Sequence, residues 1–566
     1  MKVRLVILNF IFLILSATLM VRFFSLQVLS HGFYENLADN QHSLSTTLNP
    51  VRGEVYIRDE KNGSFVSVVT NVEKNSLFAA PGEIEDPAAA AGALSRALGL
   101  GAGEILEKIS DPARKWVLIQ KELPESVSLE IKELALGGIY LQPENLRHYP
   151  EGPFASQVLG FVGFQDDGRA GQYGIEKEYE EELAGLPGSL FLESDTSGTW
   201  ITGGYRNLVP AQDGADVYLT LDRAIQFKAE EAVSRAVELH QADRGALMVM
   251  EAETGAVLAI AQAPGFDPNR YGETEDISVF RNIAVSDSYE PGSVFKPVTM
   301  AAALDAEAVT PDMTYEDAGF VAFDDFTIRN SDNKAYGTQT MTQVLESSLN
   351  TGVIFAQNQL GPEKFLRALE RFGFGETTGI KLPAEAAGDL GNLIGGGDVH
   401  YATAAFGQGI TATMAQLAQA YATIANQGRL TAPYIVEKIV RPGGDVQAFK
   451  PKKGASVISP RAAATLGAML VSVVENGHGK RAGVPGYFLG GKTGTAQVAS
   501  REGGGYDPNV TIGTFAGFGP IDDPKFVMVV RIDNPKGVRF AESTAAPVFG
   551  EMAQFLFNYF QIPPSR

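Results

Sequence analysis

The sequence predicts an α/β chain: one transmembrane helix, then an α+β domain, then an antiparallel sheet of about five strands flanked by helices. Three observations carry this prediction. An uncharged apolar run opens the chain, and short extended runs mix with Ala- and Glu-rich helical stretches through the first half. The second half has strand patterns at both ends and helical patterns between them. With 566 residues, the chain is long enough for several domains.

The N-terminal run is predicted to be a membrane anchor over residues 5–28. Leu5 to Val21 carries no charge and would span roughly 26 Å as a helix, enough for a bilayer core. Lys2 and Arg4 precede it, so the positive-inside rule predicts a cytoplasmic tail at residues 1–4 and export of the rest. A cleaved signal peptide is the alternative, but no small-residue cleavage site follows the run.

The first half after the anchor, residues 40–205, is predicted to be a non-catalytic α+β domain. Short extended runs such as Gly53 to Ile57 alternate with helical stretches, and no candidate nucleophile, base and orienting residue cluster there. A stretch rich in Gly, Pro and Asp at 185–214 indicates the join to the second half.

The second half, residues 215–562, is predicted to be one α/β domain. The expected strands are 245–250, 255–261, 492–498, 511–518 and 526–532. Helical patterns lie between them, including one at 414–425. The last helix should bury an apolar stripe made of Phe549, Met552, Phe555, Leu556 and Tyr559.

Composition excludes several kinds of function. Hydrophobic residues make up 45% and charged residues 20%, which are globular values. The formal charge of −21 argues against nucleic-acid binding, because phosphate contacts need clustered cations. The chain has no cysteine, which excludes thiolate zinc sites, iron–sulfur clusters and cysteine nucleophiles. We therefore predict no cofactor and no metal.

The pattern Ser-x-x-Lys occurs twice, and only one copy has a helical context. Ser293 to Lys296 precedes a good helix, and Pro297 is tolerated only near a helix start, which places Ser293 in the first turn. There the helix dipole favours a developing alkoxide, and Lys296 lies on the same face. The other copy, Ser331 to Lys334, lies among turn-forming residues and is predicted to be a loop.

A serine nucleophile needs a base, and Lys296 is the candidate because none of the six histidines lies in a nucleophile motif. A lysine of ordinary pKa, near 10.4, is only about 0.04% neutral at pH 7. Lowering that pKa by roughly three units takes about 4 kcal/mol, which desolvation and a second cation can supply. Lys492, in a Lys-Thr-Gly-Thr segment, is the candidate cation.

Between Lys296 and Lys492 in the sequence lies a third segment, which contains Ser348 and Asn350. We expect both on a helix that begins after Thr340, where Gln343 completes a capping box. Each motif alone is more often structural, as an N-cap serine or a solvated lysine. Their order along the chain favours catalysis.

A competing motif overlaps the segment that contains Lys492. Residues 486–493 satisfy the phosphate-binding pattern Gly-x-x-x-x-Gly-Lys-Thr. Such a loop follows an apolar strand and opens a helix, whereas here the apolar residues lie inside the loop and a Gly-rich break soon follows. The sequence therefore argues against an ATPase.

Taken together, these motifs resemble the transpeptidase domain of class B penicillin-binding proteins. The segments that carry the resemblance are Tyr289 to Lys296, Ser348 to Asn350, Gly407 to Gly409, Ala425 to Gly428 and Lys492 to Gln497. Arg52 to Val55, Arg147 to Pro150 and Gly174 to Glu176 resemble the family's non-catalytic, dimerisation-like pedestal. Val294 stands where the family more often has Thr.

The resemblance implies a serine D,D-transpeptidase. Ser293 would attack the penultimate D-Ala carbonyl of a peptidoglycan stem peptide, expel the terminal D-Ala and form an acyl-enzyme that an amine of a neighbouring stem resolves. Lys296 would take the serine proton and Ser348 would relay protons to the leaving group. Asn350 would orient Lys296 and the substrate amide. β-Lactams would acylate Ser293.

The resemblance also assigns the segment that begins at Lys492. This lysine would supply positive potential, and the substrate-binding residues would be Thr493, Gly494 and Thr495, with the two threonines on the donor carboxylate. The backbone N–H groups of Ser293 and Thr495 would form the oxyanion hole, worth about 3–4 kcal/mol per donor.

Finer features are similar to the division (septal) branch of the family more than to the elongation branch. They are Glu290 before Pro-Gly and the segment from Ile532 to Phe549. The resemblance further implies a bacterial cell membrane location and partnership with a SEDS-type glycosyltransferase and other division proteins. An elongation-type transpeptidase, a β-lactam hydrolase or sensor, and an inactive scaffold stay open as alternatives.

Overall fold

A computed structural model describes residues 2–32, 43–59, 63–165, 168–193, 201, 206–323, 326–451, 454–499 and 505–565. The chain divides into two compact units. The smaller comprises residues 1–52 and 184–214, and the larger comprises residues 53–183 and 215–566. The larger unit holds every residue of the candidate site.

The smaller unit contains an apolar helix and a small sheet. Helix α1 (Lys2–Phe24) continues as a π-helical turn to Leu29, and this stretch is long and apolar enough to cross a membrane. Strand β8 (Gly188–Glu193) pairs antiparallel with β1 (Ser43–Leu48) and β9 (Arg206–Val209). The predicted join at 185–214 is therefore partly strand, and its residues 194–200 and 202–205 lie outside the described part of the chain.

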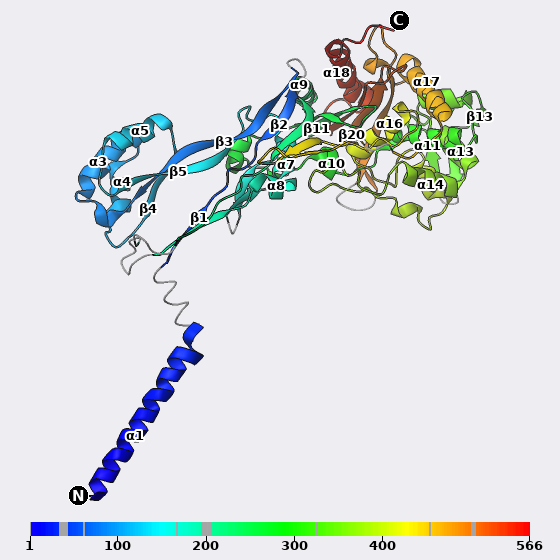
Figure 1. Cartoon of the computed structure of the whole chain (residues 1–566). Coiled ribbons are helices and arrows are strands. Elements are labelled where there is room, and N and C mark those ends of the chain that lie inside the picture. The colour runs from blue at the N-terminus through cyan, green and yellow to red at the C-terminus, as the bar shows by residue number, and fades with distance from the viewer. Residues whose placement is uncertain are drawn as a thin grey trace. The chain divides into compact units, whose positions relative to one another are not determined.

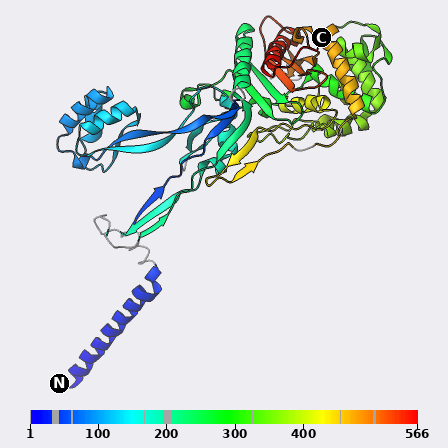
Figure 2. The same ribbon diagram turned by 45° about the horizontal axis from the view of Figure 1, so that its top comes forward.

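The larger unit begins with a sheet whose strands come from distant parts of the sequence. Its order is β18 (Val446–Ala448), β17 (Val436–Val440), β10 (Asp216–Asp222), β2 (Val55–Asp59), β3 (Ser64–Ala79) and β4 (Val117–Leu123), with β5 (Ile139–His148) also paired to β3. Only β10 and β2 run parallel. Figures 1 and 2 show β3 and β5 as a long ribbon that ends among three helices. These helices are α3 (Pro87–Leu98), α4 (Ala102–Ile109) and α5 (Glu125–Glu133).

Short elements follow this sheet before the second core begins. They are α6 (Ser156–Leu159), β6 (Val162–Gln165), β7 (Gly168–Gly171), α7 (Gly174–Glu178) and α8 (Glu180–Ala184). An aromatic cluster that includes Phe161, Tyr173 and Phe280 packs beside α7.

A five-stranded antiparallel sheet forms the centre of the second half and confirms the predicted fold class. The strand order is β12 (Val257–Ala263), β11 (Arg244–Glu251), β21 (Phe526–Asp533), β20 (Tyr506–Gly519) and β19 (Gly490–Ala499). Alternate side chains enter opposite cores. Leu247 packs with α9 (Arg223–Leu239) and α18 (Ala545–Tyr559), whereas Met248 packs with α16 (Met414–Ala425).

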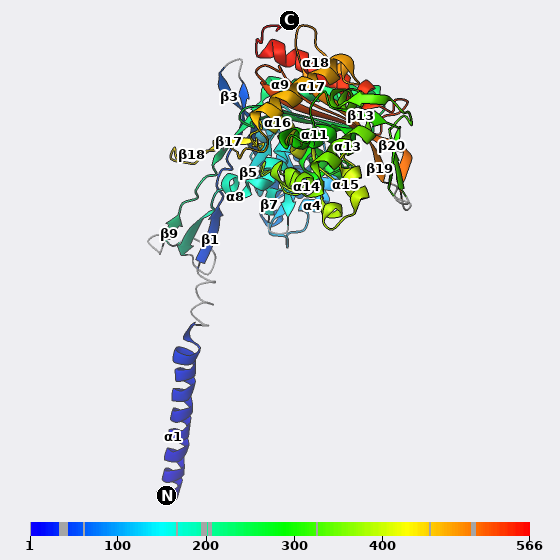
Figure 3. The ribbon, with the colours of Figure 1, turned by 90° about the vertical axis from the view of Figure 1, so that its right-hand side faces the viewer.

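Helices cover both faces of this sheet. In Figure 3, α9 and α18 lie above it, and α11 (Lys296–Asp305), α13 (Asn350–Leu360) and α14 (Pro362–Arg371) lie below. Helix α17 (Pro460–Asn476) packs on edge strand β19. The predicted stripe on α18 is confirmed: Phe549, Met552 and Leu556 are fully buried, and its other two members are partly buried.

The remaining elements form an insertion between α11 and β19. They include strands β13 (Thr314–Asp317), β14 (Phe320–Phe323), β15 (Phe326–Arg329) and β16 (Gly337–Thr340) and helices α12 (Met341–Glu346) and α15 (Asp398–Ala404). Strand β13 pairs with β16, and β14 with β15. This insertion carries the residues that hold the Ser348 segment.

Candidate active site

Ser293 lies in a tight turn at the start of a helix, as the sequence predicts. A 3-10 turn, η5 (Gly292–Phe295), leads into α11, whose first residue is Lys296. Gly292 has φ +60° and donates its N–H to Gly407 O at 2.9 Å, which fixes the turn in a conformation that favours glycine. Ser293 is half-buried, and within the described ranges its hydroxyl makes no hydrogen bond.

Two glycines let neighbouring backbone approach this turn closely. A Cβ atom on Gly494 of β19 would lie 2.8 Å from Val294 N, and one on Gly407 would lie 2.4 Å from Gly292 O. Real Cβ contacts are not this short, so any larger residue would push β19 or the 407 loop away from the serine turn. Sequence spacing alone did not reveal this packing role.

Lys296 is fully buried, and its ammonium group contacts the Ser348 segment. Nζ donates to Ser348 O at 2.5 Å and to Ser348 Oγ at 3.2 Å. Burial lowers the pKa of Lys296 well below its ordinary value, and the positive charge of Lys492 lowers it further. Among the described residues Lys296 makes no direct hydrogen bond to Ser293, so proton transfer between them needs a small side-chain movement or a bridging water.

Lys492, on β19, is the second fully buried lysine of the site. Its Nζ donates to Thr493 O at 3.1 Å and Thr493 Oγ1 at 3.4 Å. Burial lowers the pKa of Lys492 to about 7. Neither Lys492 nor Lys296 has an ion-pair partner in the described part of the chain. The site therefore brings together two cations that no carboxylate neutralises.

Ser348 does not lie on a helix, and that prediction is wrong. The capping box of Thr340 and Gln343 is present, but α12 ends at Glu346. Ser348 then adopts φ +55° in the turn before α13. A left-handed residue cannot continue a right-handed helix. The turn directs both the carbonyl and the hydroxyl of Ser348 to the Lys296 ammonium group, which one helical residue would not do.

Three further predicted residues have partners of their own. Asn350 Nδ2 donates to Arg329 O at 2.9 Å, and no hydrogen bond joins it to Lys296 among the described residues. Thr493 is buried beside Lys492. Thr495 is partly exposed, and its Oγ1 accepts the N–H of Ala541 at 3.1 Å.

A buried polar network that the sequence analysis missed holds the Ser348 turn. Asn330 Oδ1 accepts the N–H groups of Asn350 at 3.0 Å and Thr351 at 3.3 Å, and so caps α13. Asp317 accepts from Asn330 Nδ2 at 2.9 Å and from Thr351 Oγ1 at 2.8 Å. These three side chains are at most 3% exposed. They lie too far apart in sequence for any local pattern to link them.

The structure excludes the phosphate-loop interpretation. Residues 490–499 form β19, which is paired with β20 along its length, so Lys492 is on a strand and no helix follows it directly. Within the described ranges, no cluster of His, Asp and Glu side chains could hold a metal ion.

Comparisons with known proteins agree with the arrangement of these motifs. Residues 245–554 match the penicillin-binding protein transpeptidase domain, and residues 47–219 match the penicillin-binding protein dimerisation domain. The chain belongs to the class B penicillin-binding proteins. Every residue of the candidate site lies within the first of these two matches.

Similar proteins match this penicillin-binding protein over most of its length. Stage V sporulation protein D of Bacillus subtilis is 35% identical over 91% of this chain and 79% of its own. The probable peptidoglycan D,D-transpeptidase PenA of Neisseria meningitidis is 31% identical over 98% of this chain and 92% of its own. Among solved structures, penicillin-binding protein 3 of Mycobacterium tuberculosis, complexed with aztreonam, has a TM-score of 0.70 and 27% identity, covering 92% of this chain and 98% of its own.

Proposed function

We propose that this penicillin-binding protein is a serine D,D-transpeptidase that cross-links peptidoglycan stem peptides and is acylated by β-lactams at Ser293. The buried, unneutralised amine of Lys296, three residues after the serine, is the observation that carries the proposal. A lysine whose pKa is lowered in this way is uncharged often enough to act as a base toward a weak hydroxyl nucleophile.

The proposed reaction moves one proton at each bond change. The Ser293 proton passes to Lys296 Nζ as Oγ bonds to the penultimate D-Ala carbonyl carbon. When the C–N bond breaks, the proton reaches the leaving D-Ala amine through the Ser348 hydroxyl, which accepts from Nζ at 3.2 Å. An amine of a second stem peptide then attacks the ester, and Ser293 regains its proton.

The other predicted residues bind and orient the donor stem. The Lys492 charge attracts its carboxylate, and Thr493, Gly494 and Thr495 of β19 bind it along the edge of the sheet. Backbone N–H groups of Ser293 and Thr495 would stabilise the oxyanion. Asn350, on the Ser348 turn, would contact the substrate amide and, after leaving Arg329 O, Lys296.

We further propose a membrane-anchored role in division. Residues 5–28, in α1 and the π-helical turn after it, would cross the membrane, residues 1–4 would stay in the cytoplasm, and the pedestal (40–205) and transpeptidase domain (215–562) would be extracytoplasmic. A SEDS-type glycosyltransferase would supply glycan strands. If a fluorescent fusion localises to side walls rather than to division sites, the division role is wrong and an elongation role takes its place.

Labelling with a fluorescent penicillin tests the enzymatic proposal. We expect a long-lived adduct that Ser293→Ala abolishes and that Ser331→Ala preserves, since Ser331 belongs to the exposed second Ser-x-x-Lys copy. Rapid loss of the adduct would indicate a β-lactam hydrolase. Absence of any adduct in the unmodified protein would indicate an inactive scaffold.

A further inference from the structure

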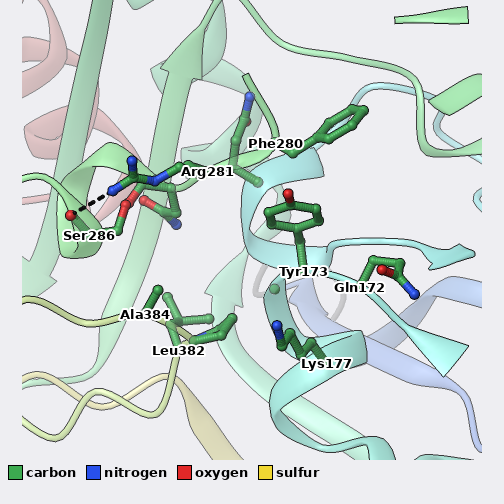
Figure 4. Close-up of a pocket in the computed structure, with 12 residues that line it drawn as sticks. Gln172, Tyr173, Lys177, Phe280, Arg281, Ser286, Leu382 and Ala384 are labelled. Atoms are coloured by element: carbon green, nitrogen blue, oxygen red, sulfur yellow. Dashed lines mark hydrogen bonds between the residues drawn. The ribbon is translucent and has the colours of Figure 1, made fainter. Parts of the chain in front are cut away.

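A pocket lies away from the catalytic serine, between α7 and two segments of the second half. It has an empty volume of about 500 Å³, including its open mouth. Its walls come from Gln157, from Gln172 to Gly174 and Lys177, from residues 280–282 and Ser286 at the end of α10 (Ile283–Ser286), and from residues 382–384. Figure 4 shows side chains from these three segments gathered around it.

The polar groups of the pocket suit an anion. Lys177 and Arg281 are exposed at its edge, and neither has an acidic partner in the ranges that the structure describes. Arg281 donates to Ser286 O at 3.1 Å, which leaves further guanidinium N–H groups available. None of the twelve lining residues is acidic, although the chain carries a net charge of −21.

One residue of the lining has a buried donor without a partner. Asn282 is 8% exposed, and its Oδ1 accepts the N–H of Ala284 at 3.1 Å and so caps α10. Its Nδ2 is buried and makes no hydrogen bond within the described structure. Leaving a buried donor unpaired costs about 1–3 kcal/mol, so such a group is well suited to meet a ligand acceptor.

Several other residues of the lining are apolar and indicate which anion fits. Tyr173 and Phe280 pack with ring centroids 5.4 Å apart, and Leu382 adds an aliphatic surface. A carboxylate on a small apolar skeleton matches both sets of groups, whereas a phosphate would leave the apolar wall uncovered.

We propose that this pocket binds a small carboxylate ligand with an apolar side chain, of the amino-acid or peptide type. The carboxylate accepts from Asn282 Nδ2 and lies near the cations of Lys177 and Arg281, and the side chain packs on Tyr173 and Phe280. The same backbone continues from Ser286 to Ser293 in seven residues, so the ligand would contact the segment that leads to the nucleophile.

Calorimetric titration of the full-length protein in detergent with N-acetyl-phenylalanine tests this site. Ser293 is first acylated with a β-lactam, so that the active site cannot take the carboxylate; should acylation fail, Ser293→Ala takes its place. We expect saturable binding of one equivalent. The uncharged amide of the same compound should not bind, and inorganic phosphate should bind more weakly.

Three variants connect the binding to the pocket. Asn282→Asp keeps the cap on Ala284 but replaces the free donor by a negative oxygen, so binding should be lost. The exposed pair Lys177→Gln and Arg281→Gln should weaken it about tenfold, because the carboxylate loses its charged partners. Lys132→Gln, on an exposed face of α5, should change nothing. No saturable binding, equal binding of phosphate, or unchanged binding in Asn282→Asp would overturn the proposal.

Discussion

Two buried cations on one sheet, Arg531 and Lys492, differ in whether carboxylates neutralise them. On β21, Arg531 is 1% exposed, donates to Asp533 Oδ1 at 2.7 Å and to Asp287 Oδ2 at 3.1 Å, and lies over the Tyr289 ring. Burial alone would lower the pKa of Arg531, but the charge of Asp533 outweighs it and the pKa is raised. On β19, two strands away, Lys492 has no carboxylate, and burial lowers its pKa to about 7.

This difference indicates that a neutralised buried cation contributes to stability, whereas an unneutralised one contributes to reactivity. A neutralised cation such as Arg531 ties β21 to the segment before the serine turn, and it stays charged at all working pH values. Lys296 and Lys492 are desolvated without a carboxylate partner, and as a result the pKa of each amine is lowered from the ordinary lysine value.

The largest expected effect comes from removing the base. Lys296→Met keeps an unbranched apolar side chain in the same space, and we expect acylation by a fluorescent penicillin to slow by about 10²–10⁴. Stopped-flow labelling measures the rate, and circular dichroism checks the fold. A rate within a few-fold of the unmodified protein would mean that another group takes the serine proton.

Removing the neutralised cation should instead destabilise the protein. Arg531→Met leaves Asp533 and Asp287 with Arg244 as their remaining cationic partner, and we expect a loss of about 1.5–3 kcal/mol in the free energy of unfolding, measured in urea, because charge-assisted hydrogen bonds are lost. Lys492→Met, which removes an unpaired buried charge, should not be destabilising. Equal losses in the two variants would contradict the distinction between the two groups.

Disrupting the network beneath the Ser348 turn should lower both the rate of acylation and the stability. Asn330→Ala removes the cap on α13, a change worth about 1–2 kcal/mol, and frees the turn that holds Ser348. We expect acylation to slow about tenfold, the equivalent of 1.4 kcal/mol. The neighbouring Ser331→Ala, in an exposed turn, is the matched control. If both variants label at the same rate, the network does not position the turn.

A further expected effect is a pH dependence of stability. The pKa of Lys492 is about 7 in the folded protein and about 10.4 when unfolded, so between these values the unfolded chain binds more protons. The unfolding free energy of the native protein should therefore rise from pH 7 to 10 relative to Lys492→Met. Thermal unfolding of both proteins at each pH measures this difference in unfolding free energy. If the native protein and Lys492→Met show the same pH dependence, Lys492 titrates with the same pKa in the folded and unfolded states.

The sequence predicted the parts of the fold that depend on local pattern. The five strands of the sheet, the α16 helix and the capping box at Thr340 follow from periodicity and turn chemistry. The proposal that Lys492 is a second cation followed from the chemical need of Lys296, and both lysines are buried and have a lowered pKa.

The missed features depend on contacts between distant residues. The turn at Ser348, which has a positive φ, is held by hydrogen bonds of Asn330 to Asn350 and of Lys296 to Ser348, and neither Asn330 nor Lys296 is near the turn in sequence. Strands β17 and β10 extend the sheet of β2 and β3, a pairing across hundreds of residues that no hydrophobic pattern specifies. Tertiary contacts override local propensity in such places.

The protonation state of Lys296 is the most direct test of the catalytic proposal. Lysine side chains labelled with ¹³C can be titrated by NMR, with Lys296→Met used to assign the signal. We expect this amine to titrate far below the ordinary lysine pKa, and the pKa to rise part of the way back in Lys492→Met, which removes the neighbouring charge. A titration near 10.4 in the native protein would contradict it, because almost no uncharged base would then be present at neutral pH.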